Sequence, residues 1–277
     1  MDLKLAKTSE SSGQNILAGD ISKAEIVKLL DEIKPSAIVH TAAHPGGKSM
    51  GEPTINLETN VLGSMRIFEW SARNQCKILY LSSSIVYGEV APVPIPETSV
   101  IKPGTIYGVA KAACEQWLSV LSEGYELDWV VLRPFSTYGV GHNPSLDQGI
   151  VNVMLTQMED GMKLIVKGSL GRLRDLVHVS DATSAICRAL EIWPSRQILN
   201  VCTGKATSVR EMIQFIAEVR GIEFSELECH ETAGTIGDPM YNVGDTGLAE
   251  KTIGFRSRIS PKEGIAHLLS RRLSVRS

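Results

Sequence analysis

The chain has 277 residues, 43% hydrophobic and 21% charged, enough for one large domain or two modest ones, and its net charge of −3 gives no electrostatic footprint for nucleic acid. No run approaches the ~18 apolar residues of a membrane helix and no signal peptide opens the chain, so we expect a cytoplasmic protein without a membrane partner. The five cysteines are odd in number and form no CxxC pair, which argues against a disulfide framework and against a metal site of the zinc type.

Short apolar runs rich in β-branched residues alternate along the chain with longer stretches of helical periodicity. Strands are predicted at residues 36–43, 77–84, 129–135 and 198–204, and helices at 59–75 and 108–125. This alternation predicts βαβ units. We therefore expect an α/β fold with a Rossmann-like, doubly wound parallel sheet and helices on both faces.

The composition changes after Arg133 and Pro134. Gly, Pro, Asn and His crowd residues 136–149, which indicates entry into a smaller α/β lobe. A further strand and helix, predicted over 173–190, would return to the main sheet. We therefore assign residues 1–140 and 172–203 to the Rossmann-like domain, and residues 141–171 and 204–277 to the smaller lobe.

Polar motifs follow three of the predicted strands. His40-Thr41-Ala42-Ala43 ends the first, Ser82-Ser83-Ser84 the second, and Arg133-Pro134-Phe135 the third. In a doubly wound sheet, ligands bind beyond the carboxyl ends of the strands. We therefore expect a binding site at this edge of the sheet.

Tyr107 and Lys111 are four residues apart near the start of a predicted helix and should project from one face. A tyrosine has a pKa near ~10, which a nearby ammonium group or the positive ring of an oxidised nicotinamide lowers. Such a tyrosine can remove a hydroxyl proton as hydride leaves the same carbon, and Ser83 could hydrogen-bond that substrate oxygen. Because this spacing also arises by chance, the alternative is a tyrosine that only packs.

Nine short segments occur in an order and spacing that are specific when taken together: AGDIS, IVHTAA, NVLGS, LSSSIVYGE, YGVAK, LRPFSTYGVG, RDLVHVSDA, NVCTG and ISPKEGI. From about residue 15 to 270 the chain resembles the extended short-chain dehydrogenase/reductase family, in particular its NAD-dependent sugar-nucleotide epimerases and dehydratases of the UDP-glucose 4-epimerase type. The resemblance implies NAD, or NADP, in the Rossmann-like domain. It implies a nucleotide sugar or another small hydroxylated substrate in the smaller lobe.

The resemblance also implies roles for individual residues. Ser83, Tyr107 and Lys111 would be the catalytic serine, the base and the partner of the base. Besides Tyr107 and Lys111, the cofactor contacts would be Asp2, Asp20, Ile21, Ala42, Ala43, Asn60, Ser82 and Pro134, and the substrate contacts would be Ser84, His44, Ser136 and Arg174. Two alternatives stay open, namely a helix N-cap for Asp20 and an ion pair with Asp175 for Arg174.

The chain departs from the family at its beginning. It contains no Gly-x-x-Gly-x-x-Gly turn, so roughly 30 residues of βαβ unit are missing from the pattern. We expect an N-terminally truncated form of a complete enzyme; the alternatives are a short protein that has lost cofactor binding and a partner chain that supplies the strand. Because the family's first strand lies in mid-sheet, its absence predicts two unpaired strand edges.

Two more departures concern the substrate. The segment TAGTIGD replaces the arginine usual shortly before Gly237-Asp238, and Ser136 replaces a common asparagine, so a smaller substrate stays an alternative to a nucleotide sugar. Ser84 and Ile85 stand where dehydratases carry Asp-Glu, so dehydration is not expected.

We therefore predict an NAD-dependent sugar 4-epimerase with a transient 4-keto intermediate. The alternatives are an NAD(P)H-dependent keto-sugar reductase and a non-catalytic sugar-nucleotide-binding or scaffold protein. Helices near residues 60–73 and 107–123 resemble those that pair across the family's dimer, so we also expect a homodimer.

Overall fold

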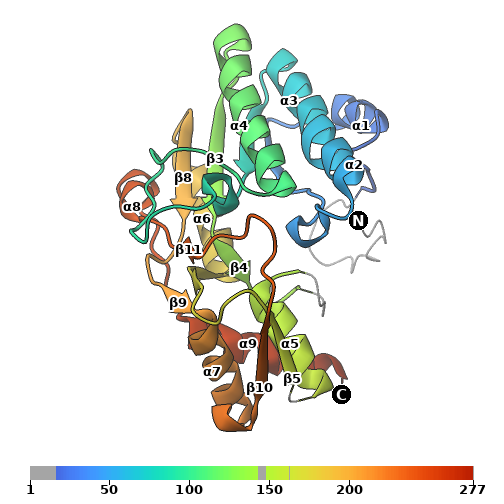
Figure 1. Cartoon of the computed structure of the whole chain (residues 1–277). Coiled ribbons are helices and arrows are strands. Elements are labelled where there is room, and N and C mark those ends of the chain that lie inside the picture. The colour runs from blue at the N-terminus through green and yellow to red at the C-terminus, as the bar shows by residue number, and fades with distance from the viewer. Residues whose placement is uncertain (1–16, 143–147, 162, 277) are drawn as a thin grey trace.

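A computed structural model describes residues 17–142, 148–161 and 163–276 of the chain. Its largest sheet has four parallel strands in the order β1-β2-β3-β8. Figure 1 labels β3 and β8 of this sheet. They are β1 (Ala37–His40), β2 (Lys77–Leu81), β3 (Trp129–Pro134) and β8 (Gln197–Val201). Three lie within the apolar runs predicted as strands and β8 begins one residue before its run, and the parallel α/β fold is confirmed.

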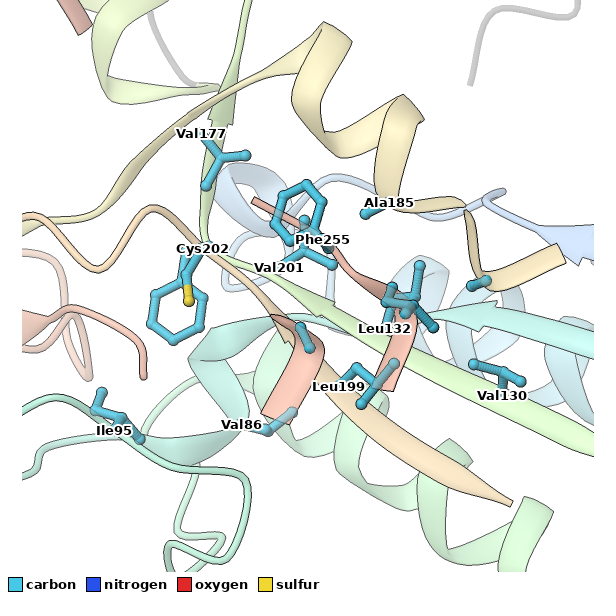
Figure 2. Close-up of a cluster of buried hydrophobic side chains, with 14 of the residues drawn as sticks. Val86, Ile95, Val130, Leu132, Val177, Ala185, Leu199, Val201, Cys202 and Phe255 are labelled. Atoms are coloured by element: carbon cyan, nitrogen blue, oxygen red, sulfur yellow. The ribbon is translucent and has the colours of Figure 1, made fainter. Parts of the chain in front are cut away.

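Helices cover both faces of this sheet because successive strand residues point to opposite sides. Leu79 and Leu132 join a core with α6 and α8, part of which is drawn in Figure 2. Ile78 and Val131 join the opposite core with α1, α3 and α4. These five helices are α1 (Glu25–Ile33), α3 (Ser64–Arg73), α4 (Ile106–Tyr125), α6 (Val179–Ile192) and α8 (Gly247–Ile253).

A third core belongs to the second half of the chain, where α5, α7 and α9 pack on β5. The helices are α5 (Ile150–Asp160), α7 (Val209–Arg220) and α9 (Pro261–Arg276). The small sheets pair β5 (Lys163–Lys167) with β10 (Glu228–Thr232), β4 (Ser136–Tyr138) with β7 (Leu176–His178), and β6 (Leu173–Arg174) with β9 (Thr207–Ser208) and β11 (Tyr241–Asn242). The residue boundaries of the two functional lobes stay a prediction.

Shorter helical segments connect these elements. They are α2 (Pro53–Asn56), the 3-10 helices η1 (Gly46–Lys48), η3 (Ser84–Tyr87) and η4 (Phe224–Glu226), and the π-helix η2 (Leu57–Gly63). The π-helix joins α2 to α3, and its wider turn is a feature often found near functional sites.

The strand predicted near residue 173 does not join the main sheet, so that part of the prediction was wrong. The chain leaving β3 pairs at once with the segment before α6, since Ser136 N–H donates to the carbonyl of Asp175 at 3.0 Å. The place beside β3 is taken by β8 instead. The helix of the predicted pair, α6, packs on the main sheet, and Val177 of β7 joins the same core without pairing with that sheet.

The free side of β1 has no strand partner among the described residues, and Val39 on β1 is 37% exposed. The expectation of two unpaired edges inside the sheet was wrong, because the four described strands are direct neighbours with no gap between them. All five cysteines are free thiols. Over the described ranges, no helix is both long and apolar enough to cross a membrane.

Candidate active site

The carboxyl ends of β2 and β3 lie next to the N-terminal half of α4, which carries Tyr107 and Lys111. The helix begins there because the Thr105 side chain accepts a hydrogen bond from Gly108 N–H at 3.0 Å, an N-cap. Lys111 Nζ donates to the carbonyl of Leu81, the last residue of β2, at 2.6 Å. Its Nζ lies 4.6 Å from the ring centre of Tyr80 and 5.7 Å from that of Tyr107.

Two cavities meet at Tyr107, which lines both. The smaller, about 280 Å³, lies over the ends of the main-sheet strands; its wall includes Thr41, Ala43, Ser82, Lys111, Pro134 and Thr137. The larger, about 780 Å³, extends toward the second half of the chain; its wall includes Gly46, Ile85, Thr105, Met154, Ile165 and Arg172. A group reacting at Tyr107 can therefore be reached from both sides.

The loop after β1 packs onto the Tyr107 ring. A Cβ placed on Gly46 would lie 3.3 Å from ring atoms Cγ and Cδ1, so the backbone is in close contact there. The amide of Asn60 holds this loop, since its Nδ2 donates to His44 O at 3.0 Å and its Oδ1 accepts from His44 N–H at 2.5 Å. Asn60 is buried in η2 and lines neither cavity, so it acts on the loop.

Burial raises the pKa of Tyr107 to about 12, so the sequence-based expectation of a lowered value was wrong. The physical reason is desolvation of the phenol, while the Lys111 ammonium is directed at Leu81 O and the Tyr80 ring. Burial also lowers the pKa of Lys111 to about 8. Near neutral pH the phenol is therefore protonated and most of the lysine carries its charge.

A buried ion pair lies beneath the site and was missed by sequence reasoning. Arg133 donates to the Glu115 carboxylate through Nε at 3.0 Å and Nη2 at 2.5 Å, and both side chains are 3% exposed. The Ser82 hydroxyl donates to the same carboxylate. The available signal was the spacing of Glu115 four residues after Lys111 on α4, which places both on one helix face.

The residues predicted to bind cofactor fall into two groups. Those on the wall of the smaller cavity are Ala43, Ser82, Tyr107, Lys111 and Pro134. Those on neither wall are Asp20, Ile21, Ala42 and Asn60, while Asp2 lies outside the described residues. Asp20 accepts from Ser22 N–H at 2.9 Å in a turn, and the N-cap of α1 is Ala24.

Ser83 and the predicted substrate contacts line neither cavity. Ser83 Oγ accepts from Ile85 N–H at 3.4 Å at the start of η3. Ser84 is buried and accepts from Asn242 Nδ2 at 3.0 Å, His44 Nε2 lies 3.2 Å from Glu52 Oε2, and Ser136 is partly exposed beside β7. Their roles stay predictions.

Arg174 pairs with Asp238, at 2.8 Å between Nη2 and Oδ1, and not with Asp175. The Asp175 carboxylate instead accepts hydrogen bonds from Thr203 and Gly204 N–H, at 2.7 and 2.9 Å. Arg172 forms an ion pair with the other oxygen of Asp238. Of the two arginines only Arg172 lies on the wall of the larger cavity, and sequence reasoning did not single it out.

The sequence profile of the NAD dependent epimerase/dehydratase family matches residues 3–202. The chain belongs to this family. A UDP-glucose 4-epimerase from Mycolicibacterium smegmatis is 30% identical over 266 residues, which cover 95% of this chain and 84% of that protein.

Solved structures of UDP-glucose 4-epimerases are also similar to this chain. A Thermotoga maritima UDP-glucose 4-epimerase with UDP-glucose is 26% identical and superimposes with a TM-score of 0.87, over 94% of this chain and 84% of that one. A Thermus thermophilus UDP-glucose 4-epimerase in complex with NAD is 27% identical, with a TM-score of 0.85 over 96% of this chain and 88% of that one.

The cofactor of the family is NAD. The smaller cavity fits the nicotinamide end of such a molecule, because small side chains, Ala43 and Pro134, leave room beside the hydroxyl of Ser82 and the ammonium of Lys111. No Gly-x-x-Gly-x-x-Gly turn occurs in the sequence, and none of these wall residues is suited to the pyrophosphate of a dinucleotide except Lys111.

Proposed function

We propose that this chain is an NAD-dependent 4-epimerase of a nucleotide sugar. The observation that carries the proposal is the position of Tyr107, which lines both the cavity that fits nicotinamide and the larger cavity beside it. A substrate carbon bound next to this phenol would have a proton acceptor on its hydroxyl and a hydride acceptor within the other cavity.

The chain's own residues would move and hold the proton. Bound NAD would supply the site that accepts and returns the hydride. Tyr107 would act as the phenolate, a form that the positive charge of the oxidised nicotinamide and the Lys111 ammonium would favour by lowering the pKa of the phenol. The phenolate would take the proton of the C4 hydroxyl as the hydride leaves that carbon, and the phenol would return it when the hydride comes back to the opposite face. The Lys111 ammonium would stabilise the phenolate, and Ser83 would hydrogen-bond the reacting oxygen.

The larger cavity supports a charged substrate of nucleotide-sugar size. Its volume, about 780 Å³, lies within the roughly 300–1,000 Å³ typical of small-molecule sites. Three cationic side chains lie on its wall, those of Lys163, Lys167 and Arg172, against two anionic ones, those of Asp160 and Asp238. A substrate with negative charge is therefore favoured over a neutral sugar.

The test is the interconversion of UDP-glucose and UDP-galactose by the purified chain in the presence of NAD, followed by proton NMR. We expect turnover without net consumption of NAD, and its loss in Tyr107→Phe with UDP-glucose binding retained. Thr105→Ser, which keeps the N-cap hydroxyl, is the control. Consumption of NADH with a keto sugar would favour the reductase, and binding without any turnover would favour the non-catalytic protein.

We further propose a homodimer that pairs α2, η2 and α4 with the same elements of a second copy. Val109, Trp117 and Val120 on α4 are 41–64% exposed, and Ile55 and Leu62 on the neighbouring α2 and η2 are 47% and 43% exposed. These elements lie side by side (Figure 1). The cytoplasmic location stays a prediction, which fractionation of source cells would test.

A further inference from the structure

Helix α5 forms one wall of the larger cavity and makes polar contacts from a different face. Its residues on the cavity wall are Ile150, Val153, Met154, Gln157 and Asp160. Positions 152, 156 and 159 share another face of the helix, because they are four and three residues apart, and they do not line the cavity. Contacts made at these three positions therefore act on the cavity only through the position of the helix.

One arginine of the C-terminal helix α9 contacts all three of these positions. Arg272 Nη2 donates to Asn152 Oδ1. Its Nη1 donates to Thr156 Oγ1 at 3.3 Å and to Glu159 Oε1 at 3.2 Å. Arg272 and Asn152 are 9% and 0% exposed, so these bonds are sheltered from water. The planar, charged guanidinium thus holds α5 and α9 side by side (Figure 1).

On its cavity face, α5 has a second polar contact, which is exposed to solvent. The Gln157 side chain accepts from Ile165 N–H at 2.7 Å and donates to Ile165 O at 3.2 Å, which ties α5 to β5. Water competes for these hydrogen bonds more readily than for the buried ones of Arg272. The contacts with Arg272 should therefore contribute more to fixing the position of α5.

We propose that Arg272 is a positioning residue for the substrate, because it holds α5 in place as a wall of the larger cavity. Tyr107 lines the same cavity, but it belongs to α4, whose start is fixed by Thr105 and whose Lys111 is bonded to Leu81 of the main sheet. Loss of Arg272 should therefore weaken the binding of the ligand and leave the proton-transfer groups in place. The inference rests on the proposed function for the identity of that ligand.

The test measures the epimerisation of UDP-glucose by the purified full chain with NAD, and the binding of UDP-glucose by isothermal titration calorimetry. We expect Arg272→Gln to raise KM and Kd about 10-fold, short of the roughly 100-fold that a 1 Å misplacement can cost, and to leave kcat unchanged. A merely structural role would instead lower the folded fraction, and with it the apparent kcat, at an unchanged KM. That result, or an unchanged Kd, would overturn the proposal.

Two variants on α9 serve as conservative replacement and control. Arg272→Lys keeps a positive charge beside Glu159 but lacks the planar fork of donors, so its KM should lie between those of the unmodified chain and Arg272→Gln. Lys262→Gln removes an exposed ion pair between the same helix and Glu218, 2.6 Å long, and should leave KM and kcat unchanged. A rise of KM in Lys262→Gln as large as in Arg272→Gln would contradict the specific role of Arg272.

A double-mutant cycle shows whether Arg272 acts through α5. Asn152→Ala removes the partner of Arg272 Nη2 on that helix. Because both changes break the same contact, Arg272→Gln/Asn152→Ala should raise KM no more than the stronger single variant does. Effects on KM that multiply in the double variant would mean that Arg272 acts elsewhere, and would overturn the proposal.

Amide hydrogen exchange of the ligand-free chain lets the two proposals fail separately. The amides of α5 should exchange faster in Arg272→Gln than in the unmodified chain, whereas those of α4 should not change. Unchanged exchange in α5 contradicts only the inference. Binding of UDP-glucose that depends on Arg272 without any epimerisation contradicts only the proposed function. If the unmodified chain binds no UDP-glucose, the proposed substrate is wrong, and the exchange of the α5 amides still decides whether Arg272 holds this wall.

Discussion

The buried Glu115 carboxylate should be the polar group whose loss destabilises this fold most directly. It accepts two hydrogen bonds from Arg133 and one from Ser82, with both charged side chains 3% exposed. Glu115→Leu leaves the Arg133 guanidinium buried without its counter-ion, which costs about 3–5 kcal/mol. With a melting-point change of about 2–4 °C per kcal/mol in chains of this size, Tm should fall by roughly 10 °C.

The assay is thermal unfolding followed by circular dichroism, with the double variant Arg133→Met/Glu115→Leu beside the single one. Replacing both members of a buried pair by apolar residues of similar volume is often close to neutral, so the double variant should recover most of the lost Tm. A single variant within about 1 °C of the unmodified chain would refute the reasoning. So would a double variant that melts as early as the single one.

Three further predictions concern the site. Burial lowers the pKa of Lys111 from 10.5 to about 8, so epimerase activity that needs its positive charge should fall as the pH rises through 8, which a pH–rate profile checks. The free energy of unfolding should rise between pH 8 and 10.5, because the unfolded chain binds more protons than the folded one in this range, and unfolding measured at each pH checks it. Asn60→Ala leaves the N–H and the carbonyl of His44 unpaired, so the free energy of unfolding should fall by about 1–3 kcal/mol and kcat should also fall. An unchanged kcat would show that the loop after β1 does not affect catalysis. Trp117→Glu should give a monomer in sedimentation velocity, and a persistent dimer would place the interface elsewhere.

The main sheet could be predicted from the sequence because its two central strands, β2 and β3, are mostly apolar runs buried on both faces. The position of Tyr107 in the first turn of α4 could also be predicted from the sequence, because a local signal, the N-cap Thr105, fixes where this helix begins. The pKa of Tyr107 was not accessible. It depends on burial beneath Gly46, 61 positions earlier in the chain, and no local pattern reports that contact.

Sequence reasoning singled out Arg174 and missed Arg172, which lines the larger cavity, for the same reason. The two side chains are two residues apart, so alternation along a strand does not separate them. What separates them is Asp238, which is 66 and 64 residues away and lies between them, and the contact of Gly168 with one guanidinium. These contacts join segments that are far apart in the sequence, so they cannot be predicted from the local pattern around the two arginines.

One backbone contact joins two segments of the wall of the larger cavity. Gly237, with a φ of +75°, packs so closely on Gly104 that a Cβ on Gly237 would overlap the Gly104 carbonyl. Gly237 precedes Asp238, and Gly104 precedes the Thr105 N-cap of the helix that carries Tyr107. A substrate anion that bound beside Asp238 would therefore lie at a distance from the Tyr107 phenol that is set by main chain and not by flexible side chains. Binding energy from the remote phosphate can then be used to orient the reacting carbon, which is how distant contacts raise the rate of a chemical step.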